Sequence, residues 1–294
     1  MILLQKKLDL NIAALHINHL LRGAESDGDE TWVREFCREL NIPLQVQRID
    51  AQAFATEHGW GIEEGARRLR YELLEQFATE QGASLIALAH HADDQVETVL
   101  HHFLRGTGLR GLTGMKSRRE LRDRLWIVRP LLEIRRTELE EALREWKQDS
   151  REDSTNRETH YTRNRLRNEL LPLLEKEFNP QAAEAILSLS RQAKESQDLI
   201  QQLAESLLET QLLERTAEFC RLSKPEFKDQ PRHLIREAFV QLWRLQNWPR
   251  QQMNYLQWDR LAGIALGESE GGTFPGPIEV SRVRKEVHLR SSML

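Results

Sequence analysis

The side chains best suited to chemistry follow a short apolar segment near the middle of the chain. Residues 84–89 (SLIALA) predict a buried strand, and two histidines and two aspartates come directly after it, among them His90 and Asp94. In the helical pattern that follows, Asp94 and Glu97 are three residues apart and share one face. Carboxylates clustered there suit a divalent cation or an amine. The alternative is that Asp93 or Asp94, with Glu97, caps the helix on a solvated face.

A second apolar segment ends in the same way. Residues 11–17 (NIAALHI) predict a strand, and His16, Asn18 and His19 lie at its end. Parallel strands bring their carboxyl ends to one edge of a sheet, where α/β proteins bind ligands. We therefore expect the two polar clusters to meet in one crevice. A single histidine is more often structural, but its repetition after two strands favours a binding site.

The order of the elements indicates the fold class. The first half alternates helices with strands, which we expect at 11–17, 43–49, 84–89 and 124–130. Helical patterns dominate after residue 164, including an amphipathic segment over 181–214. The last part, from residue 223, predicts two helices and then one or two strands. This pattern predicts an α/β chain with a parallel Rossmann-like sheet, a helical linker and a small α+β domain.

The composition narrows the class of protein. The chain has 294 residues, which suggests two domains, and its 39% hydrophobic and 30% charged residues are typical of a globular protein. No apolar run approaches the roughly 20 residues of a membrane-spanning helix. Cys37 and Cys220 have neither metal-site nor disulfide-framework spacing, so we expect buried, reduced thiols. The net charge of −4 excludes a uniformly basic surface but leaves room for a local basic patch.

The segment 104–124 is rich in glycine and basic side chains. Between residues 105 and 129 there are eight basic residues against two acidic ones. Basic glycine-rich loops suit phosphate groups. An ordinary surface loop is the alternative.

Two other basic clusters could also bind an anion. Arg67 and Arg70 are three residues apart on a predicted helix, although the helix could equally be a solvated face paired with neighbouring glutamates. Near the start of another helix lie Arg157, Arg163, Arg165 and Arg167, which suit a phosphate backbone. His160 and Tyr161 precede the last three and could stack on a base.

Several motifs, taken in order, resemble a known family. HINHLLRG (16–23), EEGARRLRY (63–71), LAHHADDQVETVLHHFLRGTGLRGL (88–112), RPLL (129–132) and DSTN followed by RNRLRNELLP (153–172) resemble the tRNA(Ile)-lysidine synthases, of the N-type ATP-pyrophosphatase superfamily. The resemblance is strong over residues 8–190. The tail from WDRLAGIALGE is similar to the family's smaller substrate-binding domain.

The resemblance implies a domain plan and a reaction. An adenine nucleotide alpha hydrolase-like catalytic domain would occupy residues 1–150, a helical extension 151–215 and a tRNA-binding domain 216–294. With ATP, the enzyme would adenylate the wobble cytidine in the CAU anticodon of tRNA(Ile). Free L-lysine would then displace AMP to form lysidine, in the cytoplasm. The oligomeric state stays open, with a homodimer as one alternative.

The resemblance also implies roles for particular residues. The catalytic group would comprise Asp94, Glu97, Arg70 and His90, with Asp94 also binding Mg²⁺. The nucleotide would contact His16, Asn18 and Arg105. The tRNA would contact Arg163, Arg165, Arg110 and Lys116.

One part of the family pattern is missing. The family has a Ser-Gly-Gly-x-Asp-Ser loop that binds the ATP phosphates, directly after a first strand, whereas this sequence has no glycine before Gly23. We therefore expect residues 1–294 alone to have little adenylation activity, and the strands at 11–17 and 84–89 to have unpaired edges. We also expect Met1 to be an internal methionine of a longer reading frame.

Two other functions remain open from the sequence. A metal-dependent hydrolase could use Asp94, Glu97 and His101 together with His90 or His91. A non-catalytic, truncated homologue could bind tRNA without turning over ATP.

Overall fold

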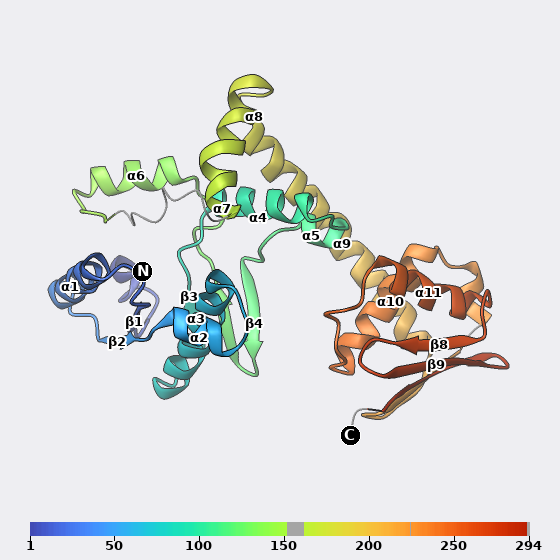
Figure 1. Ribbon diagram of the computed structural model, residues 1–294. Helices are drawn as coiled ribbons and strands as arrows, with labels where there is room; N and C mark the ends of the chain where they lie inside the picture. The colour runs from blue at the N-terminus through green and yellow to red at the C-terminus, as the bar shows by residue number, and fades with distance from the viewer. Residues whose placement is uncertain (152–161, 224, 293–294) are drawn as a thin grey trace. The chain divides into compact units, whose positions relative to one another are not determined.

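The computed structural model describes residues 1–151, 162–223 and 225–292, which form two compact units (Figure 1). Unit 1 comprises residues 1–101 and 114–187, and unit 2 comprises residues 102–113 and 188–294. The α/β class is confirmed, with a parallel sheet, a helical segment and a small C-terminal sheet. The functional division at residues 150 and 215 stays a prediction.

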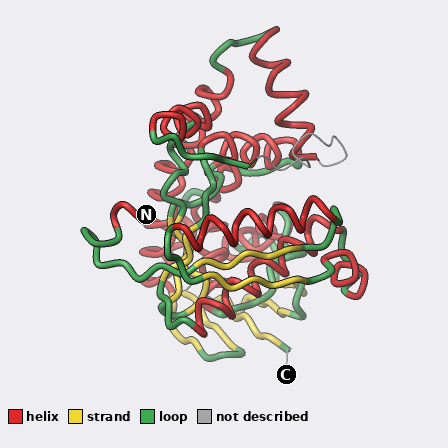
Figure 2. Tube along the Cα trace, turned by 90° about the vertical axis from the view of Figure 1, so that its left-hand side faces the viewer, coloured by secondary structure: helices red, strands yellow, loops and turns green. Residues whose placement is uncertain are grey.

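Unit 1 begins with a parallel pair of strands. After a short turn, η1 (Ile2–Leu4), strand β1 (Ala14–Asn18) pairs in parallel with β2 (Leu44–Arg48). Helix α1 (Ala24–Glu39) makes the crossover between them and lies along both strands (Figure 2). The polar end of β1 therefore faces the start of this helix.

A second sheet in unit 1 holds the other predicted strands. Two helices, α2 (Ala51–Glu57) and α3 (Ile62–Glu80), lead to β3 (Leu85–Ala87), which pairs in parallel with β5 (Leu125–Val128). Ala78 of α3 packs with Ile86 and Ile127 in the core beneath these strands. Helix α4 (Ala92–Leu104) starts directly after β3, so Asp94 and Glu97 lie in its first turns.

The basic loop prediction was wrong over part of its length. The segment 104–124 contains a short helix, α5 (Leu109–Leu112), and a strand, β4 (Arg118–Arg122), antiparallel to β5. Arginine has no strong preference for strands. Here the guanidinium of Arg118 stacks on the ring of Trp126, 3.9 Å from its centroid, and Leu121 packs on the core. Pairing with β5 decided the conformation.

The predicted parallel sheet is in two pieces. Among the described residues, β1 pairs only with β2, and β3 pairs only with β5, so no strand joins β1 to β3. Each of these strands therefore has one edge without a neighbouring strand.

Helices complete unit 1 after the sheets. They are α6 (Arg136–Glu145), α7 (Thr162–Arg165), the π-helical turn η3 (Leu166–Leu170), α8 (Leu171–Glu177) and the first part of α9 (Ala182–Gln211). Leu166 and Leu187 pack against Val96 and Leu100 of α4. This apolar contact positions the arginine-rich segment against the first turns of α4.

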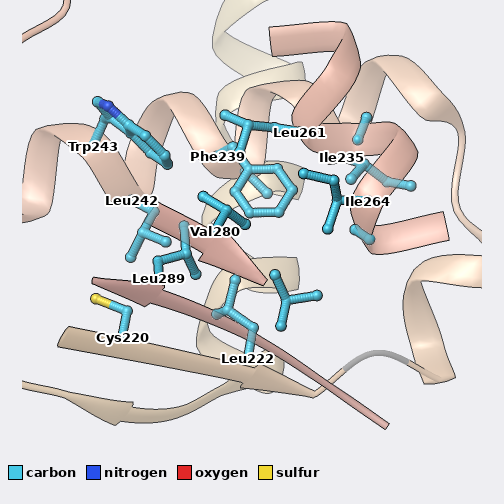
Figure 3. Packing of buried hydrophobic residues seen from close by; sticks show 14 of the residues in the cluster. Cys220, Leu222, Ile235, Phe239, Leu242, Trp243, Leu261, Ile264, Val280 and Leu289 are labelled. Atoms are coloured by element: carbon cyan, nitrogen blue, oxygen red, sulfur yellow. The ribbon is translucent and has the colours of Figure 1, made fainter. Parts of the chain in front are cut away.

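Unit 2 packs two helices on an antiparallel sheet. The strands are β6 (Leu212–Arg215), β7 (Phe219–Ser223), β10 (Glu286–Ser291), β9 (Ile278–Val283) and β8 (Gly271–Phe274), in that spatial order. The turn η4 (Pro225–Asp229) leads to α10 (Arg232–Leu245) and then to α11 (Tyr255–Leu266). We expected one or two strands, but β6 and β7 also form because alternate residues such as Cys220 and Leu222 complete the apolar face under the helices (Figure 3).

Both cysteines are free and buried, as predicted. Within the part of the chain that the structure describes, no helix is both long enough and apolar enough to cross a bilayer.

The core of unit 2 predicts a strong effect of one substitution. The Trp243 side chain is fully buried, and its ring packs edge-on against Trp248, Trp258 and Phe274. Trp243→Ala should lower the free energy of unfolding of this unit by about 3–5 kcal/mol, because the cavity cannot close around three aromatic neighbours. Urea denaturation followed by circular dichroism measures this. The control is Trp146→Ala, at an exposed position, where a change within about 0.5 kcal/mol is expected. Equal losses of stability in Trp243→Ala and Trp146→Ala would contradict the burial of Trp243.

Candidate functional site

A cavity of about 1430 Å³ opens in unit 1 between β1, β3 and α3. At its polar end lie His16, His19, Arg70 and Arg163. His90 is near these residues too, since the charges of Arg70 and Arg163 help to lower its pKa. The ends of β1 and β3 are therefore both near Arg70 and Arg163, and the expected single binding crevice stays a prediction.

The histidines of this site are neutral at pH 7. Burial lowers the pKa of His16, and it lowers the pKa of His19 to about 4, assisted by the charge of Arg70. The buried Nε2 of His16 and Nδ1 of His19 have no hydrogen-bond partner in the described chain. A neutral imidazole offers one donor and one acceptor, so these rings suit a polar planar ligand such as a nucleobase.

Arg70 forms no ion pair with any described residue. Its pKa is lowered, first by burial in the concave surface and then by the charges of Arg163 and Arg67. Cations that repel one another in a cavity favour an anion there, and the planar guanidinium fits phosphate oxygens. The anion alternative for this helix is therefore favoured at Arg70. Arg67 instead pairs with Glu64, at 2.9 Å.

Arg129 holds His90 in place. Its Nε donates to Nδ1 of His90 at 3.1 Å, and its Nη1 donates to the Lys116 carbonyl oxygen at 2.8 Å. Burial, and next the charge of Arg129, lower the pKa of His90 to about 4. Because Nδ1 accepts a bond, the proton of the neutral ring must be on Nε2, which can donate to a ligand.

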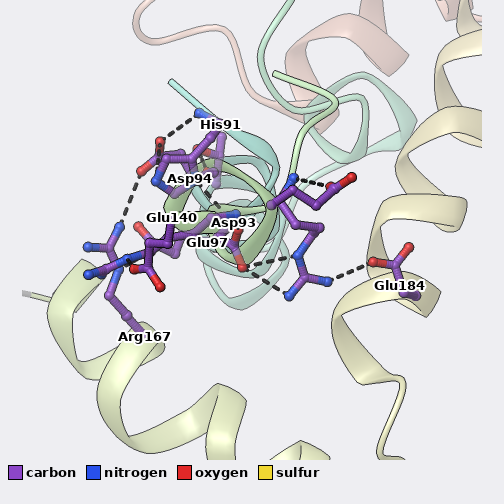
Figure 4. Close-up of polar contacts among 11 residues, drawn as sticks. His91, Asp93, Asp94, Glu97, Glu140, Arg167 and Glu184 are labelled. Atoms are coloured by element: carbon purple, nitrogen blue, oxygen red, sulfur yellow. Dashed lines mark hydrogen bonds and ion pairs between the residues drawn. The ribbon is translucent and has the colours of Figure 1, made fainter. Parts of the chain in front are cut away.

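Asp94 and Glu97 bind one arginine together. Arg167 donates from Nε to Glu97 at 2.5 Å and from Nη2 to Asp94 at 3.2 Å (Figure 4). The Glu97 side chain is only 5% exposed. Burial raises its pKa above the ordinary value, and Arg167 only partly offsets this effect. The two carboxylates therefore form a site for a cationic group.

The other acidic residue of this turn has a structural role. Burial alone would raise the pKa of Asp93, but bonds from His91, the Arg136 backbone N–H and Arg135 hold it well below its usual range. Arg135 also pairs with Glu184 of α9 at 2.7 Å, so Asp93 ties α4 to two other helices. Asp94 does more than bind the cation Arg167. Its Oδ2 also accepts the backbone N–H of His91 at 2.9 Å, as a carboxylate that caps the start of a helix does.

The carboxylates do not fit a protein-held Mg²⁺ in this arrangement. Arg167 already bonds to both, and the second oxygen of Asp94 accepts a backbone N–H. Among the described residues there is no group of three side chains that could hold a metal ion. The hydrolase alternative, which needs such a group, thus has no support in this part of the chain.

Asn18 is buried and bonded within its own βα unit. Its amide donates to Glu30 at 3.1 Å, and its oxygen accepts the backbone N–H of Leu20 at 3.1 Å. The bond from Asn18, with those from Arg48 and Arg34, lowers the pKa of Glu30 to about 2. Asn18 therefore shapes the turn after β1, and its predicted contact with a nucleotide stays a prediction.

The remaining predicted basic residues are spread over both units. Lys116 is exposed in unit 1, and Arg165 pairs there with Glu169 at 3.2 Å. Arg105 and Arg110 belong to unit 2, where Arg110 pairs with Glu237 at 2.7 Å. Arg157, His160 and Tyr161 lie outside the described residues.

Sequence patterns did not identify the contacts that two arginines of the site make. Arg129 appeared in a general basic excess and in the RPLL motif, but without a role of its own, although it follows an apolar strand as His90 does. Arg167 lies in the same helical segment as Arg163 and Arg165, and nothing in the spacing distinguished it. The contact of α4 with η3 brings it to Glu97.

Comparisons with known proteins place these features in a family. The model of a PP-loop domain matches residues 1–174. A tRNA(Ile)-lysidine synthase of Rhodopirellula baltica is 34% identical over 317 residues, covering 95% of this chain and 80% of that protein. The synthase of Bacteroides thetaiotaomicron is 44% identical over 177 residues, covering 60% of this chain and 40% of its own.

Other relatives match a smaller share of their length. The tRNA(Ile)-lysidine synthase of Clostridioides difficile is 37% identical over 203 residues. The match covers 69% of this chain and 43% of that protein. Among solved structures, the U34-tRNA thiolase NcsA of Methanococcus maripaludis has a TM-score of 0.51 at 17% identity, covering 65% of this chain and 67% of that one. That likeness concerns the fold alone.

Removing the counter-ion of Glu97 should destabilise unit 1 in a pH-dependent way. Arg167→Met leaves the buried Glu97 carboxylate with only the more distant Arg163, at 4.0 Å, as a counter-ion, which should cost about 3–5 kcal/mol at neutral pH. The pKa of Glu97 is higher in the folded chain than in the unfolded chain. The stability that this carboxyl group contributes is therefore full below its unfolded-state pKa, and it is lost as the pH rises through its folded-state pKa. Thermal melts at pH 4 and pH 8 should therefore show the larger loss at pH 8.

Two variants control this experiment. Arg165→Met, which breaks an exposed pair, should cost at most about 1 kcal/mol. Adding Glu97→Gln to Arg167→Met should remove most of the pH dependence. A loss that is independent of pH would contradict the assignment.

The neutral histidines predict a second pH effect. The folded pKa of His90, about 4, lies below the ordinary histidine value of 6.5. Its contribution to stability is therefore present above pH 6.5 and lost as pH falls through about 4. His90→Gln should reduce the drop in melting temperature between pH 7 and pH 4, whereas His58→Gln, at an exposed position, should leave it unchanged. An unaltered drop in His90→Gln would refute the burial of this ring.

Proposed function

Because this chain belongs to the tRNA(Ile)-lysidine synthase family of PP-loop proteins, we propose that it is a ligase that uses ATP to modify tRNA. The observation that supports the proposal is that neutral, basic and acidic side chains lie near the ends of β1 and β3. Neutral imidazoles, an unpaired Arg70 and a carboxylate pair gather around one cavity and the start of one helix.

The proposed reaction has two steps. The C2 carbonyl oxygen of the wobble cytidine in a CAU anticodon attacks the α-phosphorus of ATP, and pyrophosphate leaves. The deprotonated side-chain amine of L-lysine then attacks C2, the bond from C2 to the AMP oxygen breaks, and a proton is lost from nitrogen. Lysidine and AMP are the products. A tRNA substrate places the reaction in the cytoplasm.

The cavity supports nucleotide binding at the polar ends of the strands. His16 and His19 line the cavity, and a neutral imidazole can donate to or accept from an adenine edge. Arg70 would hold a phosphate group, and His90 could donate to a phosphate or carbonyl oxygen from Nε2. Asn18 would then act on the nucleotide through the backbone turn that it fixes.

The carboxylate pair supports binding of the amine substrate. Asp94 and Glu97 already hold a cationic guanidinium, and a lysine ammonium carries the same charge. Arg167 would have to move or share the two carboxylates when lysine arrives. Mg²⁺ would enter with the ATP phosphates, as it commonly does, and not as an ion held in advance by Asp94.

The tRNA would contact both units through basic side chains. In unit 1, Arg163, Arg165 and Lys116 would bind phosphates near the site. In unit 2, Arg105 and Arg110 would do so together with the C-terminal domain. Such contacts weaken with salt, so tRNA affinity should fall steeply between low and moderate ionic strength.

The test measures incorporation of radiolabelled lysine into a tRNA(Ile) transcript with a CAU anticodon. Residues 1–294 are compared with a version that carries an N-terminal strand and Ser-Gly-Gly-x-Asp-Ser loop of the family type. We expect incorporation by the extended version that depends on ATP. Asp94→Asn in that version should reduce it at least 100-fold, because the neutral amide no longer attracts the ammonium, whereas tRNA binding in a filter assay should be unchanged.

Two controls separate the alternatives. Glu169→Gln changes an exposed carboxylate of the same unit and should leave incorporation unaltered. The synthase of Rhodopirellula baltica serves as the positive control. Undiminished incorporation by Asp94→Asn would remove Asp94 from the reaction. Binding of tRNA without any incorporation by either version would favour the non-catalytic homologue.

A further inference from the structure

One face of helix α10, in unit 2, carries three polar side chains in a row. Glu237, Gln241 and Arg244 are spaced i, i+4 and i+7, so they share this face. Arg110 of α5 donates to one oxygen of Glu237 at 2.7 Å, and Gln197 of α9 donates to the same oxygen at 3.2 Å. The face is therefore directed towards α5 and α9, which belong to unit 2 in these segments.

Arg244 forms no ion pair with any described residue. Its Nη1 donates to the side-chain oxygen of Gln241 at 3.5 Å, which is a long and weak bond. Burial, and next the charges of Arg110 and Arg250, lower the pKa of Arg244 to about 10. The guanidinium is thus still charged at neutral pH, and it lies half-buried near two other cations.

The carboxylates near this guanidinium already have other partners. Glu237 accepts from two side chains, and Glu205 accepts from the amide of Gln201 at 2.8 Å. Each of these two carboxylates affects the pKa of Arg244 less than either neighbouring arginine does. The excess charge beside Arg244 is therefore positive, which favours an anion there.

The amide of Gln241 adds a buried donor next to this cation. The residue is only 5% exposed, and its Nε2 has no hydrogen-bond partner among the described residues. Its Oε1 bonds to Arg244, so the unused N–H groups of the amide lie beside the guanidinium. A buried N–H without an acceptor lowers stability, and a bound anion would supply the acceptor.

The end of α10 does not require Arg244 as a cap. A basic side chain in the last turn of a helix often bonds to the final carbonyl groups. Here the carbonyl oxygens of Leu242, Trp243 and Arg244 accept backbone N–H groups from residues 246–248 instead. The guanidinium is therefore available to a ligand.

We propose that Arg244, Gln241 and Arg110 form a binding site for a phosphate group in unit 2. Two guanidinium groups and an amide present several N–H donors, which suit the oxygens of one tetrahedral anion. The anion would neutralise Arg244 and accept from Nε2 of Gln241. Arg250, which is exposed, would add positive charge at the rim. The phosphate would belong to the tRNA backbone, a source that rests on the proposed function, or would be a free phosphate.

The first experiment titrates inorganic phosphate into the whole chain, isotope-labelled at its glutamine side chains, with ionic strength held constant by sodium chloride. The NMR signal of the Gln241 amide, assigned by its loss in Gln241→Met, should shift until the site is saturated. Arg244→Met should weaken this binding at least 10-fold. Arg284→Met removes an exposed arginine elsewhere in unit 2 and should leave the binding unchanged.

Melting temperatures separate a ligand site from a structural role. Arg244→Met keeps an apolar side chain of similar length and removes a cation that lies near two others. Without phosphate, its melting temperature should equal or exceed that of the unchanged chain. Phosphate should raise the melting temperature of the unchanged chain more than that of Arg244→Met, because a ligand stabilises only the state that binds it.

Filter binding of the tRNA(Ile) transcript identifies the source of the phosphate. For a tRNA phosphate, Arg244→Met should weaken tRNA binding at least 3-fold and reduce its salt dependence by about one phosphate contact. Unchanged tRNA binding by a variant that has lost phosphate binding would assign the site to a free phosphate. Both results support the site. Absence of tRNA binding by the unchanged chain would count against the proposed function and not against the site.

Two results would overturn the proposal. One is a Gln241 amide signal that phosphate shifts no more than chloride does. The other is a melting temperature that falls in Arg244→Met by the same amount with and without phosphate, which would make Arg244 a structural residue. The phosphate assays contain no ATP, lysine or tRNA, so their failure leaves the proposed reaction untouched.

Discussion

A buried carboxylate needs a counter-ion, and in unit 1 this requirement joins segments that are 70 residues apart in sequence. Glu97 is buried where α4 meets η3, and Arg167 is the cation that neutralises it. An apolar contact would tolerate small shifts between these helices, but a charged pair in a poorly solvated place does not. The position of Asp94 and Glu97 relative to β3 therefore depends on this arginine.

On the other side of the site, a cation lacks a described counter-ion. Arg70 lies among other cations and has no described counter-ion, and the histidines around it are neutral because they are buried. One half of the site thus attracts an anion and the other half holds a cation. A reaction between a phosphorylated nucleotide and an amine requires this separation of charge, because each substrate must be held without neutralising the other.

The amino-acid sequence alone determined the alternation of strands and helices, the apolar face of α4 and the clustering of polar residues after β1 and β3. These features depend on periodicity, which is local along the chain. Tertiary structure decided the rest. Arg118 and its neighbours form a strand only because β5 is beside them, and Arg167 was indistinguishable from Arg163 and Arg165 until α4 and η3 packed together. The choice among several arginines depends on which one reaches a buried charge, and that distance is a property of the fold.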